Sequence, residues 1–251
     1  MKIKLLGKNL DDIRPLLTKY GFEESDGEVE LIVTHGGDGA LLGAERDFPG
    51  IPKFPLRDAA TAPTCTCHEA ERRLRDFVSG NHGGISILPK VTATAPGGSI
   101  SGINDVFLHS ISRTSALRYR VMIDDELYAV EVVGDAVGLS TVHGSGAYYR
   151  SITHGVFRVG LGLSFSNSTE AVDHMVLDSA SSVEITVIRG TGILAADNSP
   201  ETITVNEGES VIFRQDESCA SVWDLAAFMC PDCRLLRHPQ PHPLNNCPQE
   251  K

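Results

Sequence analysis

One stretch near the start of the chain limits its possible folds more than any other. Residues 31–34, Leu-Ile-Val-Thr, form a short apolar run that is typical of a β-strand buried on both faces. This run leads into the glycine-rich residues 36–39, and residues 40–46 then have the pattern of a helix. A strand, a glycine-rich turn and a helix in this order are typical of α/β nucleotide-binding folds.

The neighbouring segments extend this pattern through the first third of the chain. Residues 2–6 are predicted to form a strand and residues 9–20 a helix whose apolar residues share one face. Residues 49–64 hold four prolines and little periodicity, so we expect a loop there. Another helix is predicted over residues 68–78, and the segment 80–84 has the glycine-rich composition of a domain boundary.

Beyond that boundary, short stretches rich in β-branched residues predict strands. They cover residues 85–88, 105–109, 117–123, 127–133, 156–163, 183–188, 202–205 and 210–213. The predicted fold class is therefore α+β: a small N-terminal α/β domain with a glycine-rich phosphate turn, followed by a β-rich, sandwich-like C-terminal domain. We place the domains at residues 1–84 and 85–229, with a C-terminal tail at 230–251. Residues 223–229 predict a last short helix, and the proline-rich residues 238–251 a loose end.

Composition limits the partners of the chain. The formal net charge is −11, so there is no general electrostatic attraction for nucleic acid. An anionic substrate must then be held by local features such as backbone N–H groups, a few basic side chains or a bound metal ion. We find no run of 18 apolar residues and no signal peptide, so we expect a cytoplasmic protein without a membrane partner.

The glycine-rich turn suits phosphate chemistry. Gly36, Gly37 and Gly39 allow the backbone to approach a phosphate closely, and the N–H groups at the start of the helix can bind it. Asp38, held among these glycines, can bind Mg²⁺ or accept a proton from an attacking hydroxyl. A plain Gly-Asp-Gly turn is the alternative, and the local pattern alone favours neither.

Two further motifs lie in the β-rich part. Asn104 and Asp105 precede a predicted strand, and an amide beside a carboxylate suits a pair of ribose hydroxyls. Taken alone, an Asx-turn at the strand start is the better interpretation of this pair. Residues 134–148 combine glycines and small hydroxyl residues with Asp135 and Tyr148, which suits the edge and the face of a base. A structural loop rarely needs this composition, so residues 134–148 are the most specific local signal.

In this order and spacing, the three motifs resemble those of the NAD kinase family. That family has a Gly-Gly-Asp-Gly turn, then an Asn-Glu pair, then a Gly-Asp-Gly stretch that leads into a run rich in Ser, Thr and Gly and ending in Ala-Tyr. The resemblance covers about residues 1–215, and the order of three motifs is more specific than any one of them. It includes residues 194–198, which look like a late strand of the family that ends in an acidic residue.

The resemblance implies a reaction and roles for individual residues. The reaction is phosphorylation of the 2′-hydroxyl of the adenosine ribose of NAD, with ATP or polyphosphate as donor and Mg²⁺ or another divalent cation as cofactor. Asp38 would activate or place that hydroxyl, and Asn104 and Asp105 would hold ribose hydroxyls and adenine. The other implied contacts are Ser140, Ala147 and Tyr148 at adenine, Asp135 and Ser151 on the nicotinamide side, and Asp197 in the same cleft. The resemblance also implies a homodimer or homotetramer.

The chain departs from the family at several of these positions. Ala40 replaces the usual Thr, Asp105 is one methylene shorter than the usual Glu, and Gly146 replaces a Thr that helps to bind adenine. The family's Gly-x-Leu-Gly-Phe stretch is absent, and residues 51–58 stand in its place. These departures leave the predicted fold intact and bear on the substrate.

Four basic side chains have two interpretations each. Lys53 and Arg57 could supply positive charge for a phosphate, although surface positions are slightly favoured. His143 and His154 flank the third motif, and each could contact a phosphate, although a surface or core histidine is the commoner outcome.

Six cysteines raise the question of metal binding. In the absence of a secretory signal, free thiols or metal ligands are favoured over disulfides. Cys230 and Cys233 have the spacing of a zinc knuckle, and residues 65–68, Cys-Thr-Cys-His, could complete four ligands. Free thiols are the favoured interpretation, and a structural zinc site is the alternative.

Two other functions remain open. A related kinase acting on another hydroxyl substrate would share the Gly-Gly-Asp-Gly turn, but it would not need residues 134–148. A non-catalytic dinucleotide-binding protein on the same fold is the second, and the substitutions at Ala40, Asp105 and Gly146 leave this alternative open.

Overall fold

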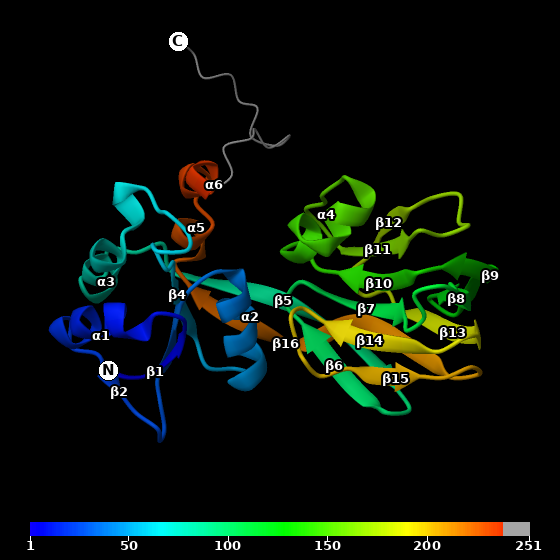
Figure 1. Ribbon diagram of the computed structural model, residues 1–251, viewed down its shortest axis with the longest axis horizontal. Coiled ribbons are helices and arrows are strands. Elements are labelled where there is room, and N and C mark those ends of the chain that lie inside the picture. Colours follow the sequence, from blue (N-terminus) through cyan, green and yellow to red (C-terminus); the bar gives the residue numbers. More distant parts are fainter. Residues whose placement is uncertain (238–251) are drawn as a thin grey trace, which may run out of the picture. The chain divides into compact units, whose positions relative to one another are not determined.

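The computed structural model describes residues 1–237, and these form two compact units (Figure 1). The first unit contains residues 1–87 together with residues 220–237, and the second contains residues 88–219. The boundary predicted after residue 84 is close to the first division, whereas residues 220–229 return to the first unit instead of ending the second. The predicted loose end at 238–251 lies outside the described residues.

A parallel sheet with the strand order β2-β1-β3-β4-β16 forms the centre of the first unit. Its strands are β1 (Lys2–Gly7), β2 (Glu23–Glu24), β3 (Leu31–His35), β4 (Lys53–Leu56) and the last part of β16 (Ser210–Trp223). Every residue of β3 is buried, as its apolar run predicts. The loop predicted over residues 49–64 is wrong at β4, because Pro52 and Pro55 hide the pattern of this short strand.

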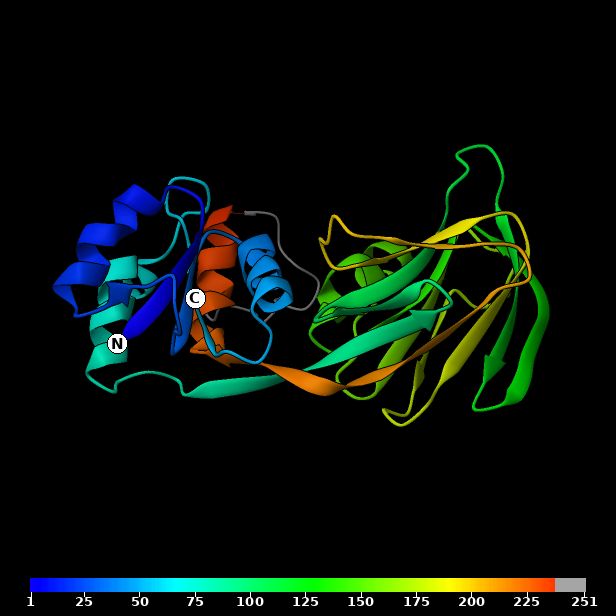
Figure 2. The same ribbon diagram turned by 90° about the horizontal axis from the view of Figure 1, so that it is seen from below.

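Helices cover both faces of this sheet (Figure 2). On one face α1 (Leu10–Lys19) packs against α3 (Ala70–Val78), which follows the single-turn helix η1 (Thr66–His68). On the other face lies α2 (Asp38–Asp47), and α5 (Leu225–Phe228) packs against β4. The last described helix, α6 (Pro231–Arg237), occupies part of the segment predicted as a tail. Among residues 1–237, every helix is too short or too polar to span a lipid bilayer.

The interpretation of Lys53 and Arg57 as surface residues is wrong, because both side chains are buried. Lys53 Nζ forms an ion pair with the carboxylate of Glu45 on α2 and donates to the carbonyl of Phe48 at 2.9 Å. These contacts compensate a positive charge that would otherwise be costly to bury. Arg57 directly follows β4 and belongs to the candidate site.

The second unit is a sandwich of two largely antiparallel sheets, which confirms the predicted β-rich second half. One sheet has the order β16-β13-β8-β9, with β5 paired to β16 and to β6, and the other has the order β12-β11-β10-β7-β14-β15. Apolar residues of both sheets form one core. The strands are β5 (Ile85–Ala95), β6 (Gly98–Gly102), β7 (Asp105–Ser110), β8 (Leu117–Ile123), β9 (Glu126–Gly134), β10 (Ala136–Ser140), β11 (Leu161–Ser166), β12 (His174–Leu177), β13 (Val183–Arg189), β14 (Gly192–Ala196) and β15 (Ile203–Val205).

The strand β10 is the main difference from the sequence-based expectation for this unit. It lies inside the motif of residues 134–148, whose small polar residues suggested a binding loop, and all its residues are buried. Gly138 allows the close packing of β10 on β7, because a Cβ there would lie 2.3 Å from the carbonyl oxygen of Val106. After β10 the chain forms the single-turn helix η2 (Gly144–Gly146) and the short helix α4 (Tyr148–Thr153), which hold the rest of the motif.

Candidate active site

The glycine-rich turn lies where β3 ends and α2 begins. Gly37 is the N-cap residue of α2, and Asp38 is its first residue. The backbone N–H groups of a first helical turn have no partners within their helix, so this end of α2 can bind an anion. The N–H of Gly36 donates to the carbonyl of Leu56 at 2.9 Å, which attaches the turn to the end of β4.

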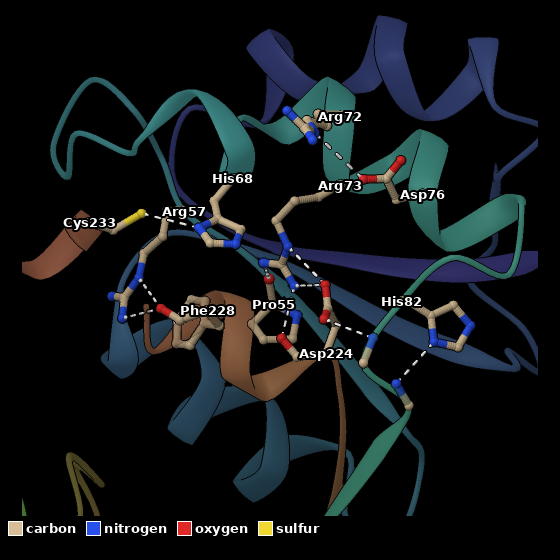
Figure 3. A network of polar contacts seen from close by, with 12 residues as sticks. Pro55, Arg57, His68, Arg72, Arg73, Asp76, His82, Asp224, Phe228 and Cys233 are labelled. Carbon is tan, nitrogen blue, oxygen red and sulfur yellow. Dashed lines mark hydrogen bonds and ion pairs between the residues drawn. The ribbon is translucent and has the colours of Figure 1, made fainter. Parts of the chain in front are cut away.

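Asp38 is exposed and forms an ion pair with the buried Arg57. Arg57 Nη2 lies 3.1 Å from Asp38 Oδ1, and the side chains are 7% and 64% exposed respectively. The Nε and Nη2 atoms of Arg57 also donate to the carbonyl of Phe228, at 3.3 and 3.2 Å, as Figure 3 shows. The guanidinium carbon lies 3.7 Å from the centre of the Phe228 ring. These contacts fix a positive charge beside Asp38.

Arg57 is the residue of this group for which sequence reasoning favoured the wrong interpretation. The carboxyl ends of neighbouring parallel strands meet at one edge of a sheet, where ligands commonly bind. Arg57 follows β4 as Gly36 follows β3, and the two strands pair in parallel. The signal that could have identified Arg57 is its position directly after a strand, and this signal was lost because β4 was expected to be a loop.

The second and third motifs meet at one edge of the β-sandwich. Asp105 is the first residue of β7, whose neighbours in the sheet are β10 and β14. Both neighbours run antiparallel to β7, so both end where it begins: Ser140 pairs with Asp105, and Ala196 pairs with Val106. The residues that follow β10 and β14 therefore lie next to Asn104 and Asp105.

Backbone contacts join the two motifs closely. The N–H of Thr141 donates to the carbonyl of Asn104 at 2.8 Å, and its hydroxyl donates to the carbonyl of Ile103 at 2.6 Å. Gly144 packs so tightly that a Cβ there would lie 2.0 Å from the carbonyl oxygen of Asn104. Thr141 and Gly144 therefore hold the turn that presents Asn104.

Asp197 organises the same turn from the end of β14. Its carboxylate accepts the N–H groups of Ile103, Asn104 and Asp105 at 2.8, 2.8 and 3.2 Å. A Cβ at position 102 would lie 2.8 Å from Asp197 Oδ1, so Gly102 leaves room for this carboxylate. The structure therefore gives Asp197 a positioning role for Asn104 and Asp105, and its direct contact with a ligand stays a prediction.

The pKa values of the two buried carboxyl groups are both raised. Burial raises the pKa of Asp105 to about 7, and the nearby charge of Asp197 adds to this effect. Burial also raises the pKa of Asp197, although its three backbone hydrogen bonds and Lys90 oppose the shift. Near neutral pH the Asp105 carboxyl is therefore present in both forms, so it can donate a hydrogen bond as well as accept one.

We expect Asp105→Asn to remove a pH-dependent loss of stability. Because the pKa of Asp105 is higher in the folded chain than in the unfolded chain, the folded state retains the proton between about pH 4 and pH 7. The protonated Asp105 therefore contributes to the free energy of unfolding at low pH. This contribution is lost as the pH rises to about 7, by about 1.4 kcal/mol per pH unit at most.

Urea unfolding of parent and variant, followed by circular dichroism, tests this expectation. Relative to the parent, the variant should gain about 2 kcal/mol in free energy of unfolding between about pH 5 and about pH 7.5. A difference between parent and variant that is the same at both pH values would show that Asp105 has an ordinary pKa.

The second unit contains a pocket of about 510 Å³ beside α4. Tyr148, Ser151 and Asn167 line it, together with His154 and two acidic residues. Asp135 does not line this pocket, but its Oδ2 accepts a hydrogen bond from Asn167 Nδ2 at 3.0 Å. Ser151 and Asp135, the two residues predicted for the nicotinamide side, therefore lie in one region, joined by Asn167. Asn167 was not identified from the sequence.

The three residues predicted to contact adenine differ in exposure. Ala147 and Tyr148 are exposed, and the Tyr148 ring meets the Phe107 ring edge to face, with centroids 4.8 Å apart. Ser140 is completely buried in β10, and its hydroxyl has no hydrogen-bond partner within residues 1–237. Ser140 was expected to line the adenine pocket, but its side chain does not reach solvent. The reason is that the motif forms a core strand, β10, up to this position.

Sequence comparisons connect the chain with one group of enzymes. No family model matches it. The NAD kinase of Brucella suis is 30% identical to it over 145 residues, and the NAD kinase of Clostridium perfringens is 28% identical over 149 residues. Each match covers 56% of this chain, and the matches cover 56% and 53% of those two proteins. The chain therefore spans about half the length of the curated relatives it matches.

Two solved structures share the fold. An NAD kinase from Archaeoglobus fulgidus in complex with ATP has a TM-score of 0.73 at 16% identity, over 93% of this chain and 99% of its own. Yeast NADH kinase complexed with NADH has a TM-score of 0.75 at 15% identity, over 97% of this chain and 89% of its own. At these identities the likeness establishes the fold.

Proposed function

We propose that this chain, a member of the NAD kinase family by its sequence similarity and its fold, transfers a phosphoryl group to the 2′-hydroxyl of the adenosine ribose of NAD. The ion pair of the exposed Asp38 with the buried Arg57, at the start of α2, carries this proposal. Phosphoryl transfer to an alcohol needs a group that accepts the hydroxyl proton and a positive charge near the transferred phosphate. Asp38 and Arg57 supply these two groups side by side.

The residues of the first unit have the following roles in the proposed reaction. Asp38 accepts the proton of the 2′-hydroxyl through Oδ2, since its ion pair with Arg57 engages Oδ1. The N–H groups at the start of α2 bind the phosphates of the donor. Arg57 orients Asp38 and adds positive charge where negative charge develops.

The residues of the second unit bind the acceptor in this proposal. Asn104 and the partly protonated Asp105 bind ribose hydroxyls and adenine, and this combination of donors and acceptors matches vicinal alcohols. The exposed Ala147 and Tyr148 pack against adenine. Asp135 and Ser151 contact the nicotinamide side of the dinucleotide in this proposal.

ATP with Mg²⁺ fits the groups at the turn. Protein sites that bind Mg²⁺ with nucleotides supply one or two carboxylates and leave the other positions to phosphates and water. The exposed carboxylate of Asp38 would be such a ligand as the alternative to its role as proton acceptor. When bound, Mg²⁺ neutralises charge on the phosphates of the donor. Polyphosphate as donor and NADH as acceptor are variants of the same proposal.

An NADP assay tests the proposal. The protein is incubated with NAD, ATP and MgCl₂, and NADP is measured with an NADP-specific dehydrogenase; we expect NADP to accumulate. Thermal stabilisation by NAD or NADP without turnover would instead identify a non-catalytic dinucleotide-binding protein. Phosphorylation of another alcohol without stabilisation by either dinucleotide would identify a related kinase.

The proposal also includes the setting of the enzyme. We infer a cytoplasmic homodimer or homotetramer that acts without a nucleic-acid or membrane partner. The net charge of −11 supports the absence of a nucleic-acid partner. Size-exclusion chromatography with light scattering would give the mass of the assembly, and a mass of about 27 kDa would exclude an oligomer.

A further inference from the structure

Four side chains with metal-ligating atoms converge in the first unit, and none of them takes part in the proposed reaction. They are Cys65, His68, Cys230 and Cys233, and their ligand atoms all lie within 4.8 Å of one another. Cys65 Sγ lies 3.1 Å from His68 Nδ1 and 3.5 Å from Cys233 Sγ. Cys233 Sγ lies 3.6 Å from His68 Nδ1, and Figure 3 shows these two side chains pointing toward each other.

We propose that these four residues bind one zinc ion as a closed structural site. Three thiolates and an imidazole are a ligand set that zinc prefers, and its structural sites are tetrahedral with four protein ligands. With zinc–ligand bonds of about 2.3 Å to sulfur and about 2.05 Å to nitrogen, a regular tetrahedron has S–S edges of about 3.8 Å and S–N edges of about 3.6 Å. The Cys65–Cys233 separation of 3.5 Å and the Cys233–His68 separation of 3.6 Å are close to these edges, and the Cys65–His68 separation of 3.1 Å is about 0.5 Å shorter than the S–N edge.

The local structure explains why the two pairs of ligands converge. Cys65 and His68 are three residues apart across η1, and Cys230 and Cys233 are three residues apart where α6 begins. This spacing brings each pair to the same side of its turn of helix. Cys230 and Cys233 are buried, and Cys65 and His68 are half-buried, so protein surrounds the cluster. A buried site with four protein ligands has no open position for a substrate, as in structural zinc sites.

Neighbouring groups suit thiolate ligands. The backbone N–H of Cys65 donates to Cys233 Sγ at 3.3 Å, which is the kind of outer contact that orients a metal-bound sulfur. Zinc with three thiolates and a neutral histidine would carry a net charge of −1. The buried guanidinium of Arg73 interacts electrostatically with Cys233 and His68, and it is held in place by Asp224 at 3.0 Å. Arg73 therefore places a positive charge near the thiolates, and it shares this charge with its ion-pair partner Asp224.

A disulfide between Cys65 and Cys233 is the main alternative. It would need the two sulfurs alone and would bring them to about 2.05 Å. It would leave unexplained why His68 and the buried Cys230 also lie within reach of both sulfurs. Zinc accounts for all four residues.

The zinc site would attach the C-terminal segment to the segment that follows β4. Cys230 is two residues from Phe228, whose carbonyl accepts two hydrogen bonds from Arg57. Fixing Cys230 therefore helps to keep Arg57 in place beside Asp38. In this proposal zinc stabilises the first unit and has no part in the chemistry.

Metal analysis of the purified full chain is the first test. After purification under reducing conditions with zinc present, we expect about one zinc per chain by mass spectrometry. Cys233→Ser should lower this content to below about 0.1 per chain and lower the melting temperature of the first unit by about 10 °C. The fluorescence of Trp223 follows that melting, because it is the single tryptophan of the chain and lies in the first unit.

Two cysteines outside the cluster provide matched controls. Cys67 is exposed and lies between Cys65 and His68, and Cys219 is half-buried in the second unit. Cys67→Ser and Cys219→Ser should each keep one zinc per chain and the parent melting temperature. Loss of zinc in Cys67→Ser but not in Cys65→Ser would overturn the assignment of ligands.

Cobalt substitution keeps the proposal testable if Cys233→Ser does not fold. Co²⁺ in the parent chain should give the intense visible bands of a tetrahedral ion and a thiolate charge-transfer band in the near ultraviolet. His68→Cys supplies a fourth thiolate, so it should retain the metal and strengthen that band by about one third, in proportion to the thiolate count. A parent chain without bound zinc or cobalt, or a Cys65–Cys233 disulfide found by peptide mapping, would overturn the zinc site. These readouts do not depend on NADP formation.

Discussion

Asp38→Asn should lower kcat for NADP formation by a factor on the order of 10³, the range observed when a general base is lost. The amide has the size of the carboxylate and can still accept a hydrogen bond from Arg57, so the turn should keep its shape. It cannot take a proton from the 2′-hydroxyl. The loss should therefore appear in kcat, with the KM for NAD changed by less than about threefold.

Steady-state kinetics with saturating ATP and Mg²⁺ measure both constants. Asp47→Asn is the matched control, because Asp47 is the last residue of the same helix and pairs with Arg46. It should retain the activity of the parent. A loss below about tenfold in Asp38→Asn would remove Asp38 from the role of proton acceptor, since general bases contribute at least about 10².

Asp197→Ala should destabilise the second unit by about 3 kcal/mol and raise the KM for NAD at least about tenfold. Its carboxylate accepts three backbone N–H groups of the turn at residues 103–105, and an alanine would leave these donors without their partner. The burial cost of the Asp197 charge, and its repulsion of Asp105, would be relieved at the same time. The three lost hydrogen bonds outweigh that relief, because each one to a charged acceptor is worth about 1.5–3 kcal/mol.

Circular dichroism follows the unfolding of both units, and Trp223 fluorescence follows the first unit in the same samples, so the part of the transition seen by circular dichroism alone belongs to the second unit. Asp178→Ala is the control, because the exposed Asp178 accepts one N–H group, that of Ala180, at 2.9 Å. It should cost less than about 1 kcal/mol. Equal losses in the two variants would mean that Asp197 does not organise the turn of Asn104.

Features of this protein that depend on neighbours in the sequence could be predicted from the sequence alone. The apolar run before Gly36 predicted the buried strand β3, and the structure has the strand, turn and helix in that order. Asp124 and Asp125 lie between the predicted strands at residues 117–123 and 127–133, and both residues have positive φ values, 51° and 64°, as a tight hairpin turn requires. The α+β class follows from the same local patterns, because periodicity reports which side of an element is buried.

The three motifs of the proposed reaction could also be identified from the sequence, because their order along the chain can be recognised without the fold. Their residue roles stay predictions. The structure changes the interpretation of two positions: Ser140 lies in a core strand, and Arg57 is buried beside Asp38. Both differences from the expectation lie at strands without a clear alternating pattern, β10 and β4.

Contacts between distant parts of the chain were decided by the tertiary structure alone. The hydrogen bond from Arg57 to the carbonyl of Phe228 joins residues 171 positions apart in the sequence. The hydrogen bond from the N–H of Ile103 to Asp197 joins residues 94 positions apart. The contact between the sulfurs of Cys65 and Cys233 spans 168 positions. It forms because the residues from 220 onward belong to the first unit, as residues 1–87 do. Such contacts depend on strand order and register, which are set by packing over the whole unit rather than by neighbouring residues. The sequence therefore determined the elements and the motif order, and the tertiary structure decided which side chains meet.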